Sequence, residues 1–196
     1  MPSQFKLFLI KHARPVFETG LPASQWRLSD EGRRGALRLV QSLAGESIQA
    51  VYTSHEPKAQ ETGQILAEAL GLPCETVPGL HEHLRGPVQS LDQAPFERQV
   101  AELFAHPDQV VFGYESANQA CRRFSLAVDS ILARHSEPCS PAIVAHGTVI
   151  SLFASRRCGL DGFELWKKLG LPFYIVLGWP GWEVIGIQEE IPQDMI

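Results

Sequence analysis

The chain has 196 residues and a formal net charge of −5 at pH 7. This length is in the range of one domain, and a mildly acidic chain without a block of like charges lacks the basic patch that nucleic acids or anionic membrane surfaces attract. No stretch approaches the roughly 18 consecutive apolar residues of a membrane span, and the N-terminus has no signal-peptide profile, so we expect a soluble, cytoplasmic protein that acts on a small molecule.

The first half of the chain alternates strand-like and helix-like segments. Apolar runs with flanking turn residues predict the strands, while Ser29 before two acidic residues and Pro57 after a strand-like run predict helix starts. In chain order, the expected elements are a strand at 5–10, a helix that begins at 29–31, a strand at 48–52, a helix from 57 to 70 and a short strand near 75–77.

The second half begins with a long irregular segment at 78–115, which contains four prolines and one helical stretch at 96–104. Long irregular insertions in compact domains are often functional, so we expect substrate specificity to come from this segment. After it we expect a helix at 116–134, a strand at 142–145, a helix at 149–157 and a hairpin of strands at 173–177 and 182–187. The alternation of strands and helices favours an α/β sheet with crossover helices.

Two histidines each follow a strand-like run: His12 after residues 5–11 and His146 after residues 142–145. Ligands of open α/β sheets bind beyond the carboxyl ends of the strands, so we expect both histidines to face one pocket. Lys11 and Arg14 place positive charge beside His12, which suits phosphate chemistry. A neutral imidazole at His12 can attack phosphorus if its other nitrogen donates to a fixed acceptor such as a backbone carbonyl.

Five short motifs in this order resemble those of the histidine phosphatase superfamily, in its phosphoglycerate mutase-like branch. The resemblance spans nearly the whole chain. The matching segments are 9–13 (LIKHA, similar to an Arg-His-Gly signature), 51–62 (VYTSHEPKAQET, similar to the second motif), 80–82 (LHE), 113–116 (GYES) and 144–147 (VAHG, the second catalytic histidine).

The resemblance implies roles for individual residues. Lys58 occupies the place of a phosphate-binding arginine, and Lys11 also stands where the family usually has arginine. Lysine keeps the charge but loses the planar fork that grips two phosphate oxygens, so Arg14 or Arg85 is a candidate for supplying a guanidinium. For Ser54, phosphate binding and helix capping are equally good interpretations.

Glu82 matches the segment that supplies the general acid in this family. It can protonate the leaving group if partial burial raises its pKa, and it would then activate water for the second step. The neighbouring His81 and His83 have a His-x-His spacing, but no further ligand stands at a recognisable spacing, and the four cysteines are scattered. We therefore expect neither a metal nor a cofactor.

Together these features predict a single domain, 1–196, with a three-layer α/β/α sandwich and a mostly parallel central sheet. We expect a metal-independent phosphomonoesterase that acts on a small phosphorylated substrate through a phosphohistidine, with His12, Glu82 and His146 catalytic. One alternative is a phosphate-binding or regulatory protein with weak turnover, and a mutase is a weaker one. In a third, a plain metabolite-binding domain, His12 and His146 would be far apart.

Overall fold

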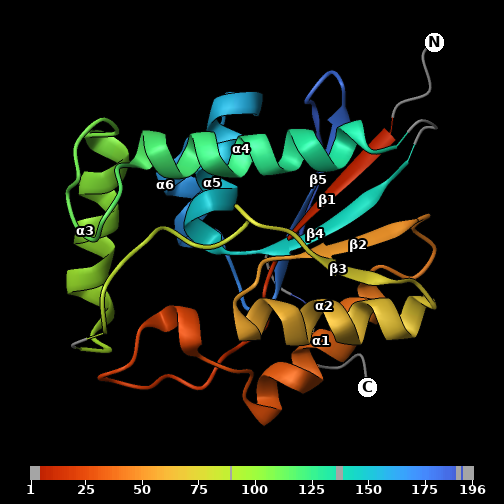
Figure 1. Cartoon of the computed structure of the whole chain (residues 1–196), viewed down its shortest axis with the longest axis horizontal. Helices are drawn as coiled ribbons and strands as arrows, with labels where there is room; N and C mark the ends of the chain where they lie inside the picture. Colours follow the sequence, from red (N-terminus) through yellow and green to blue (C-terminus); the bar gives the residue numbers. More distant parts are fainter. Residues whose placement is uncertain (1–4, 89, 136–138, 189–190, 192–196) are drawn as a thin grey trace.

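The computed structural model describes residues 5–88, 90–135, 139–188 and 191. Its strands form one sheet in the order β3-β2-β4-β1-β5-β6 (Figure 1). The strands β1, β2, β3 and β4 are parallel to one another, and β5 is antiparallel to both β1 and β6. The predicted mostly parallel sheet is confirmed. The strands are β1 (Phe5–Lys11), β2 (Ala50–Thr53), β3 (Cys74–Thr76), β4 (Pro141–Ala145), β5 (Phe173–Trp179) and β6 (Val184–Gln188).

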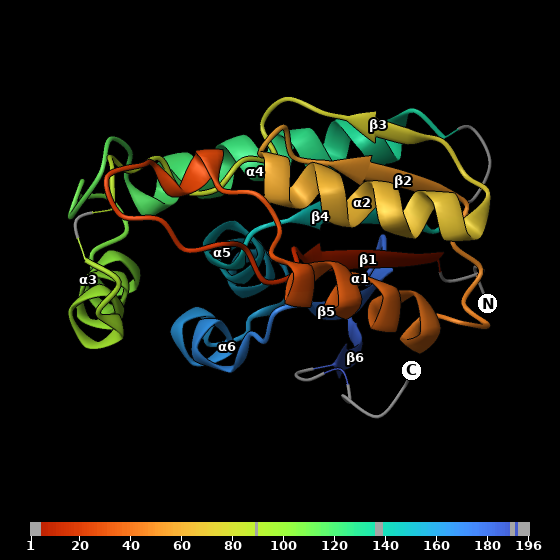
Figure 2. The ribbon, with the colours of Figure 1, turned by 90° about the horizontal axis from the view of Figure 1, so that it is seen from below.

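Helices cover both faces of the sheet, which makes the fold a three-layer sandwich. The helices α1 (Asp30–Ser42) and α2 (Pro57–Leu70) lie on one face, and α4 (Ala117–Ala133) and α5 (Gly147–Cys158) lie on the other (Figure 1). The helix α3 (Gln93–Ala105) lies apart from these layers, on the side toward which β1 points (Figure 2). Within the described part of the chain, no helix is both long and apolar enough to cross a bilayer.

The sheet separates two hydrophobic cores because successive side chains of a strand point to opposite faces. In β1, Leu7 and Leu9 pack into the core beneath α4 and α5, whereas Phe8 and Ile10 pack into the core beneath α1 and α2. All four side chains are completely buried. The apolar run at the start of the chain therefore forms a central strand, and this fixes the position of the residue that follows it.

The predicted strands and helices are present, and their starts follow the expected chemistry. The side chain of Ser29 accepts the Gly32 N–H at 3.0 Å, and α2 ends at Gly71 in the left-handed conformation with φ 66°. The helix α6 (Gly162–Lys168), which packs against α5, was not predicted from the sequence. Its seven residues are too few to show a helical apolar period.

Candidate active site

The register of the sheet brings together three residues that follow neighbouring strands. The His12 N–H donates to Ala145 O at 3.0 Å, and the Ser54 N–H donates to Val144 O at 2.9 Å. The ring centroids of His12 and His146 are consequently 5.2 Å apart. This distance contradicts the interpretation in which the two histidines are far apart in a plain metabolite-binding domain.

The imidazole of His12 is held in one tautomer. Its Nδ1 lies 2.8 Å from Ala13 O, and because a carbonyl oxygen can only accept, Nδ1 carries the hydrogen. Burial, followed by the positive charge of Lys58, lowers the pKa of His12 well below its ordinary value of 6.5. The ring is therefore neutral near pH 7, with the lone pair of Nε2 available.

His146 is completely buried at the N-cap of α5. Its Nε2 shares a hydrogen bond of 2.9 Å with Ser54 Oγ and lies 3.5 Å from Glu56 Oε1, while its Nδ1 has no hydrogen-bond partner among the described residues. Burial and the charge of Lys58 lower the pKa of His146 well below 6.5. Ser54 contacts His146 and also accepts the Glu56 N–H at 3.2 Å, just before α2 begins.

The carboxylate of Glu82 accepts hydrogen bonds from two backbone groups. Its Oε1 accepts the His83 N–H at 2.8 Å, and its Oε2 accepts the Thr148 N–H at 3.1 Å, one of the free donors in the first turn of α5. Arg85 Nη2 lies 3.3 Å from the same Oε2. Burial raises the pKa of Glu82, whereas the charge of Arg85 and these two hydrogen bonds lower it, and the net shift is downward.

The expected raised pKa of Glu82 is therefore wrong for the substrate-free site. The sequence placed Glu82 in an irregular segment, where partial burial would favour the neutral acid. In the structure, the same burial encloses the carboxylate among donors, one of which, the Thr148 N–H, comes from a part of the chain about 65 residues away. Glu82 is consequently ionised near pH 7 before substrate binds.

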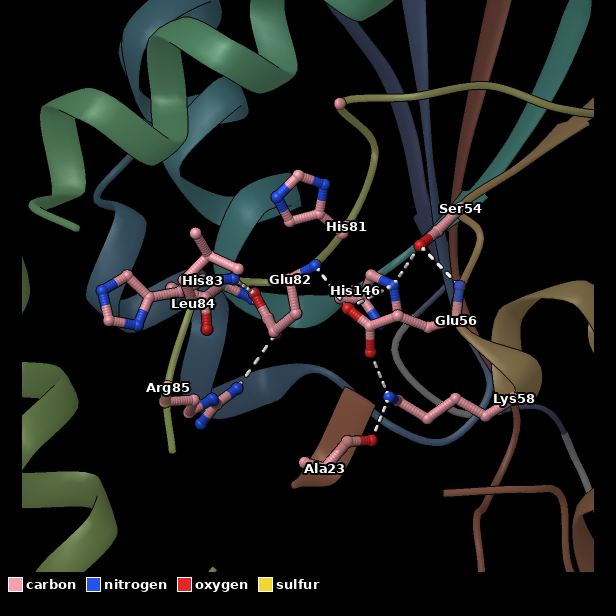
Figure 3. A network of polar contacts seen from close by, with 12 residues as sticks. Ala23, Ser54, Glu56, Lys58, His81, Glu82, His83, Leu84, Arg85 and His146 are labelled. Atoms are coloured by element: carbon pink, nitrogen blue, oxygen red, sulfur yellow. Dashed lines mark hydrogen bonds and ion pairs between the residues drawn. The ribbon is translucent and has the colours of Figure 1, made fainter. Parts of the chain in front are cut away.

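Lys58 is enclosed at the start of α2, with 3% of its surface exposed. Its Nζ donates to Ala23 O at 2.6 Å and to the carboxylate of Glu56 (Figure 3). The other oxygen of Glu56 accepts the Glu82 N–H at 2.8 Å. Glu56 was not predicted as a site residue, although it lies between Ser54 and Lys58 in the second motif. The presence of an acid so close to a predicted phosphate ligand could have indicated that it pairs with Lys58.

The other two predicted cations lie at the edge of this cluster or outside it. The Nζ of Lys11 donates to Leu169 O at 2.9 Å, and burial lowers the pKa of Lys11 to about 8, partly opposed by the charge of Glu82. Arg14 is not brought into contact with the cluster. Its guanidinium lies 3.2 Å from Glu31 at the surface, where 44% of the Arg14 side chain is exposed.

Arg85 supplies the guanidinium that reaches the cluster. It lies over the ring of Phe96, 4.7 Å from the centroid, and pairs with Glu82 from the side opposite Lys58 (Figure 3). The cavity beside these groups has a volume of about 40 Å³. It is lined by Ala23, Ser24, Glu56, Glu82, His83, Leu84 and Arg85.

The two histidines that flank Glu82 point away from each other. His83 Nε2 lies 2.8 Å from Glu115 O, whereas the ring of His81 lies 5.2 Å from that of His55 (Figure 3 shows His81 and His83 on different sides of Glu82). Among the residues that the structure describes, no group of three or more histidine, cysteine or acidic side chains is arranged to hold a metal ion. The His-x-His spacing therefore does not produce two converging ligands.

Comparisons with known proteins agree with this architecture. Residues 7–172 match the sequence model of the histidine phosphatase superfamily (branch 1). A protein from Yersinia enterocolitica named probable phosphoglycerate mutase GpmB is 28% identical over 166 residues, which are 79% of this chain and 75% of that protein.

Solved structures with the same fold include two phosphatases. A mycobacterial glucosyl-3-phosphoglycerate phosphatase superposes with a TM-score of 0.73 at 19% identity, covering 93% of this chain and 97% of its own. Phosphoserine phosphatase from Entamoeba histolytica, in complex with 3-phosphoglyceric acid, superposes with a TM-score of 0.74 at 16% identity. The superposition covers 98% of this chain and 100% of that one. At these identities the likeness shows the fold alone.

Proposed function

The chain belongs to the histidine phosphatase superfamily, and on this basis we propose that it is an enzyme that hydrolyses phosphomonoesters by transferring the phosphoryl group first to His12 and then to water. The observation that carries the proposal is the hydrogen bond from His12 Nδ1 to Ala13 O, 2.8 Å long, which directs the free Nε2 lone pair of a neutral ring away from the backbone. A nucleophile in this state needs no separate base.

In the first step, Nε2 of His12 attacks phosphorus and the bond to the ester oxygen breaks. The charge on the phosphoryl oxygens needs fixed donors, and the cations beside the cavity, Lys58 and Arg85, are held by protein contacts before substrate arrives. His146, 5.2 Å from His12 between ring centroids, is the third group of the phosphate site. Lys11 adds positive charge from the side of Leu169.

The leaving oxygen takes its proton from Glu82, which lines the cavity. Glu82 is ionised in the free site, but a bound phosphoryl dianion raises the pKa of a nearby carboxylate because like charges disfavour ionisation. In the second step, the Glu82 carboxylate removes a proton from water, and the resulting oxygen attacks the phosphohistidine. The bond from phosphorus to His12 breaks and inorganic phosphate leaves.

We propose hydrolysis in preference to mutase action. Curated relatives are named probable phosphoglycerate mutases, but the segment 14–19 after the nucleophile does not resemble the extended motif of the dedicated mutases. Arg14, the first residue of that segment, pairs with Glu31 at the surface. The substrate class that we favour is a small phosphorylated metabolite with its phosphate on an alcohol oxygen, as in phosphoserine.

The test is steady-state hydrolysis of a panel of phosphomonoesters that includes phosphoserine, 3-phosphoglycerate and nitrophenyl phosphate, with and without EDTA. Turnover that EDTA leaves unchanged supports the proposal, because Lys58 and Arg85 supply the charge that a metal ion would otherwise provide. A requirement for metal would contradict it. Interconversion of phosphoglycerates faster than their hydrolysis would assign a mutase, and phosphate binding by calorimetry without turnover would assign a regulatory protein.

A further inference from the structure

Glu56 is a buried carboxylate that the proposed mechanism does not use. Only 2% of its surface is exposed, yet it contacts three groups of the site: Lys58 through a hydrogen bond, the Glu82 N–H at 2.8 Å and His146 Nε2 at 3.5 Å. Burying a charge is costly unless it is paired, and each of these contacts compensates the cost with a group of the phosphate site itself. Glu56 is therefore part of the electrostatics of that site.

Glu56 lies among the groups from which the proposed phosphate site is built. Glu56 lines the cavity together with Glu82 and Arg85, while neither His12 nor His146 lines it. Because Glu56 also lies 3.5 Å from the buried His146, its carboxylate is between this cavity and that histidine. Figure 3 shows the carboxylate of Glu56 between His146 and Lys58.

The charged groups around the site have a net charge that a single negative charge neutralises. Lys11, Lys58 and Arg85 are cationic, Glu56 and Glu82 are anionic, and the two central histidines are neutral, so one net positive charge remains. A phosphomonoester at neutral pH is mostly a dianion. Its binding would leave one net negative charge, which a single proton neutralises.

The chemistry needs a proton at the same place. The leaving oxygen must be protonated, but Glu82 is ionised in the free site. We propose that Glu56 is a positioning residue that sets the charge of the pocket, so that binding of a dianionic phosphomonoester draws one proton from solvent onto Glu82. That proton then passes from the Glu82 carboxyl group to the leaving oxygen as the ester bond breaks. The inference rests on the proposed function.

Other titratable groups surround the two carboxylates and act on both forms of the site. Arg85 faces Glu82, and Lys58 faces Glu56 from α2. Lys11, whose pKa burial lowers to about 8, lies within the field of Glu82 and Arg85. The imidazoles of His12, His81, His83 and His146 also surround this pair, and the guanidinium of Arg123 donates to Glu82 O at 3.2 Å.

The first experiment counts protons. Binding of inorganic phosphate is measured by calorimetry at pH 7.5 in two buffers of different ionisation enthalpy, for the wild type, Glu56→Gln and Glu68→Gln. Glu68 is an exposed acid on the same helix and serves as the matched control. We expect the wild type and Glu68→Gln to take up about one proton more on binding phosphate than Glu56→Gln does. As the pH rises, the phosphate affinity of Glu56→Gln should therefore decline by about one log unit less per pH unit than that of the wild type. Equal proton uptake in all three proteins would overturn the inference.

The second experiment separates charge setting from a structural role. Glu56→Gln should bind phosphate more tightly at pH 7.5 and yet hydrolyse alkyl phosphates at least about tenfold more slowly, with little loss on nitrophenyl phosphate, whose leaving group scarcely needs a proton. If Glu56 merely holds Lys58 in place, Glu56→Gln should bind phosphate more weakly, and the rates of hydrolysis of both substrates should fall by the same factor. That result would overturn the inference.

A double variant guards against misfolding as the explanation. Glu56→Gln with Lys58→Gln restores the net charge of the pocket, so proton uptake should return to the wild-type value although phosphate affinity falls. Thermal unfolding of each variant checks that it is folded, and a double variant that keeps the proton uptake of Glu56→Gln would count against charge as the cause. If wild-type protein binds no phosphate, and His12→Ala changes nothing, the proposed function itself is wrong, which is a different outcome.

Discussion

The Nδ1 atom of His12 lies 2.8 Å from the carbonyl oxygen of Ala13, its own neighbour in the chain. This contact fixes the tautomer of the ring through one backbone group and needs no acidic partner. Because burial also lowers the pKa of His12 well below 6.5, the ring is neutral across the physiological range. The structure thus supplies the free lone pair that phosphoryl transfer to this histidine requires.

We expect His12→Ala to remove essentially all turnover, because it removes the lone pair that the hydrogen bond to Ala13 O leaves free at Nε2. Rapid quenching of the wild type with substrate should trap acid-labile phosphate, and mass spectrometry should map it to His12. His106→Ala, at an exposed histidine after α3, is the control and should keep full activity. A label on His146 or on a serine would contradict the assignment.

Glu82→Gln should slow the hydrolysis of substrates with poor leaving groups far more than that of nitrophenyl phosphate, because only the poor leaving groups need a proton on the leaving oxygen. The amide can still accept one of the two backbone N–H groups that hold the carboxylate, so the fold should be retained. The measurement is the ratio of kcat/KM values for an alkyl phosphate and nitrophenyl phosphate. Equal losses on the two substrates would remove Glu82 from this role.

Lys58→Met should cost at least tenfold in kcat/KM, or about 1.4 kcal/mol of transition-state stabilisation, because it removes a buried ammonium next to the site. Lys58→Arg keeps the charge and should be better tolerated than Lys58→Met. Lys168→Met, at the last residue of α6, is a control outside the cluster. Unchanged activity and phosphate affinity in Lys58→Met would show that Lys58 does not bind phosphate.

Stability should fall as the pH drops below about 6.5. The pKa values of His12 and His146 are both lowered in the folded protein, so below the ordinary histidine pKa the unfolded chain binds protons that the folded chain does not. Each histidine can then contribute a loss of up to about 1.4 kcal/mol per pH unit.

Thermal unfolding at pH 7.5, 6.0 and 5.0 measures this loss. His146→Gln should lose less stability over the same pH range because it removes one of the histidines whose pKa is lowered by folding. If the stability of His146→Gln fell as steeply with decreasing pH as that of the wild type, other groups would be the cause of the pH dependence.

Gly113 should be intolerant of a side chain because it holds the segment that carries Arg85. Its φ is 77°, and a Cβ atom there would lie 2.1 Å from Leu84 O and 3.2 Å from the Cα of Arg85. Gly113→Ala should therefore destabilise the protein by about 2 kcal/mol or more and weaken phosphate binding by shifting Arg85. Gly45→Ala, also at positive φ but with open space around it, is the control: it should lower stability without affecting phosphate binding.

Much of this site was predictable from local sequence. The apolar run before His12 and the buried run before His146 predicted two strands whose ends carry histidines, and the structure confirms both strands. The motif around Lys58 predicted a strand followed by a helix that begins at Pro57, which is also observed. Such features depend on residue spacing and capping, so a single sequence can show them.

Other features depend on which segments become neighbours. The sequence named Arg14 and Arg85 as alternatives, and only the fold pairs Arg14 with Glu31 at the surface while placing Arg85 against Glu82. The pKa of Glu82 is lowered, not raised, because Arg85 and the backbone N–H groups of His83 and Thr148 surround its carboxylate. Thr148 belongs to α5, which follows a different strand, so only the fold brings it to Glu82.

The sequence by itself therefore determined the order of the strands and of every helix except α6, the family, and the histidines that follow β1 and β4, because these depend on residue types at fixed spacings. The tertiary structure decided the charge states and partners of the site, including the contact between Glu56 and Lys58. A charge state is the sum of burial and of every nearby dipole and charge, and most of these neighbours are distant in the chain.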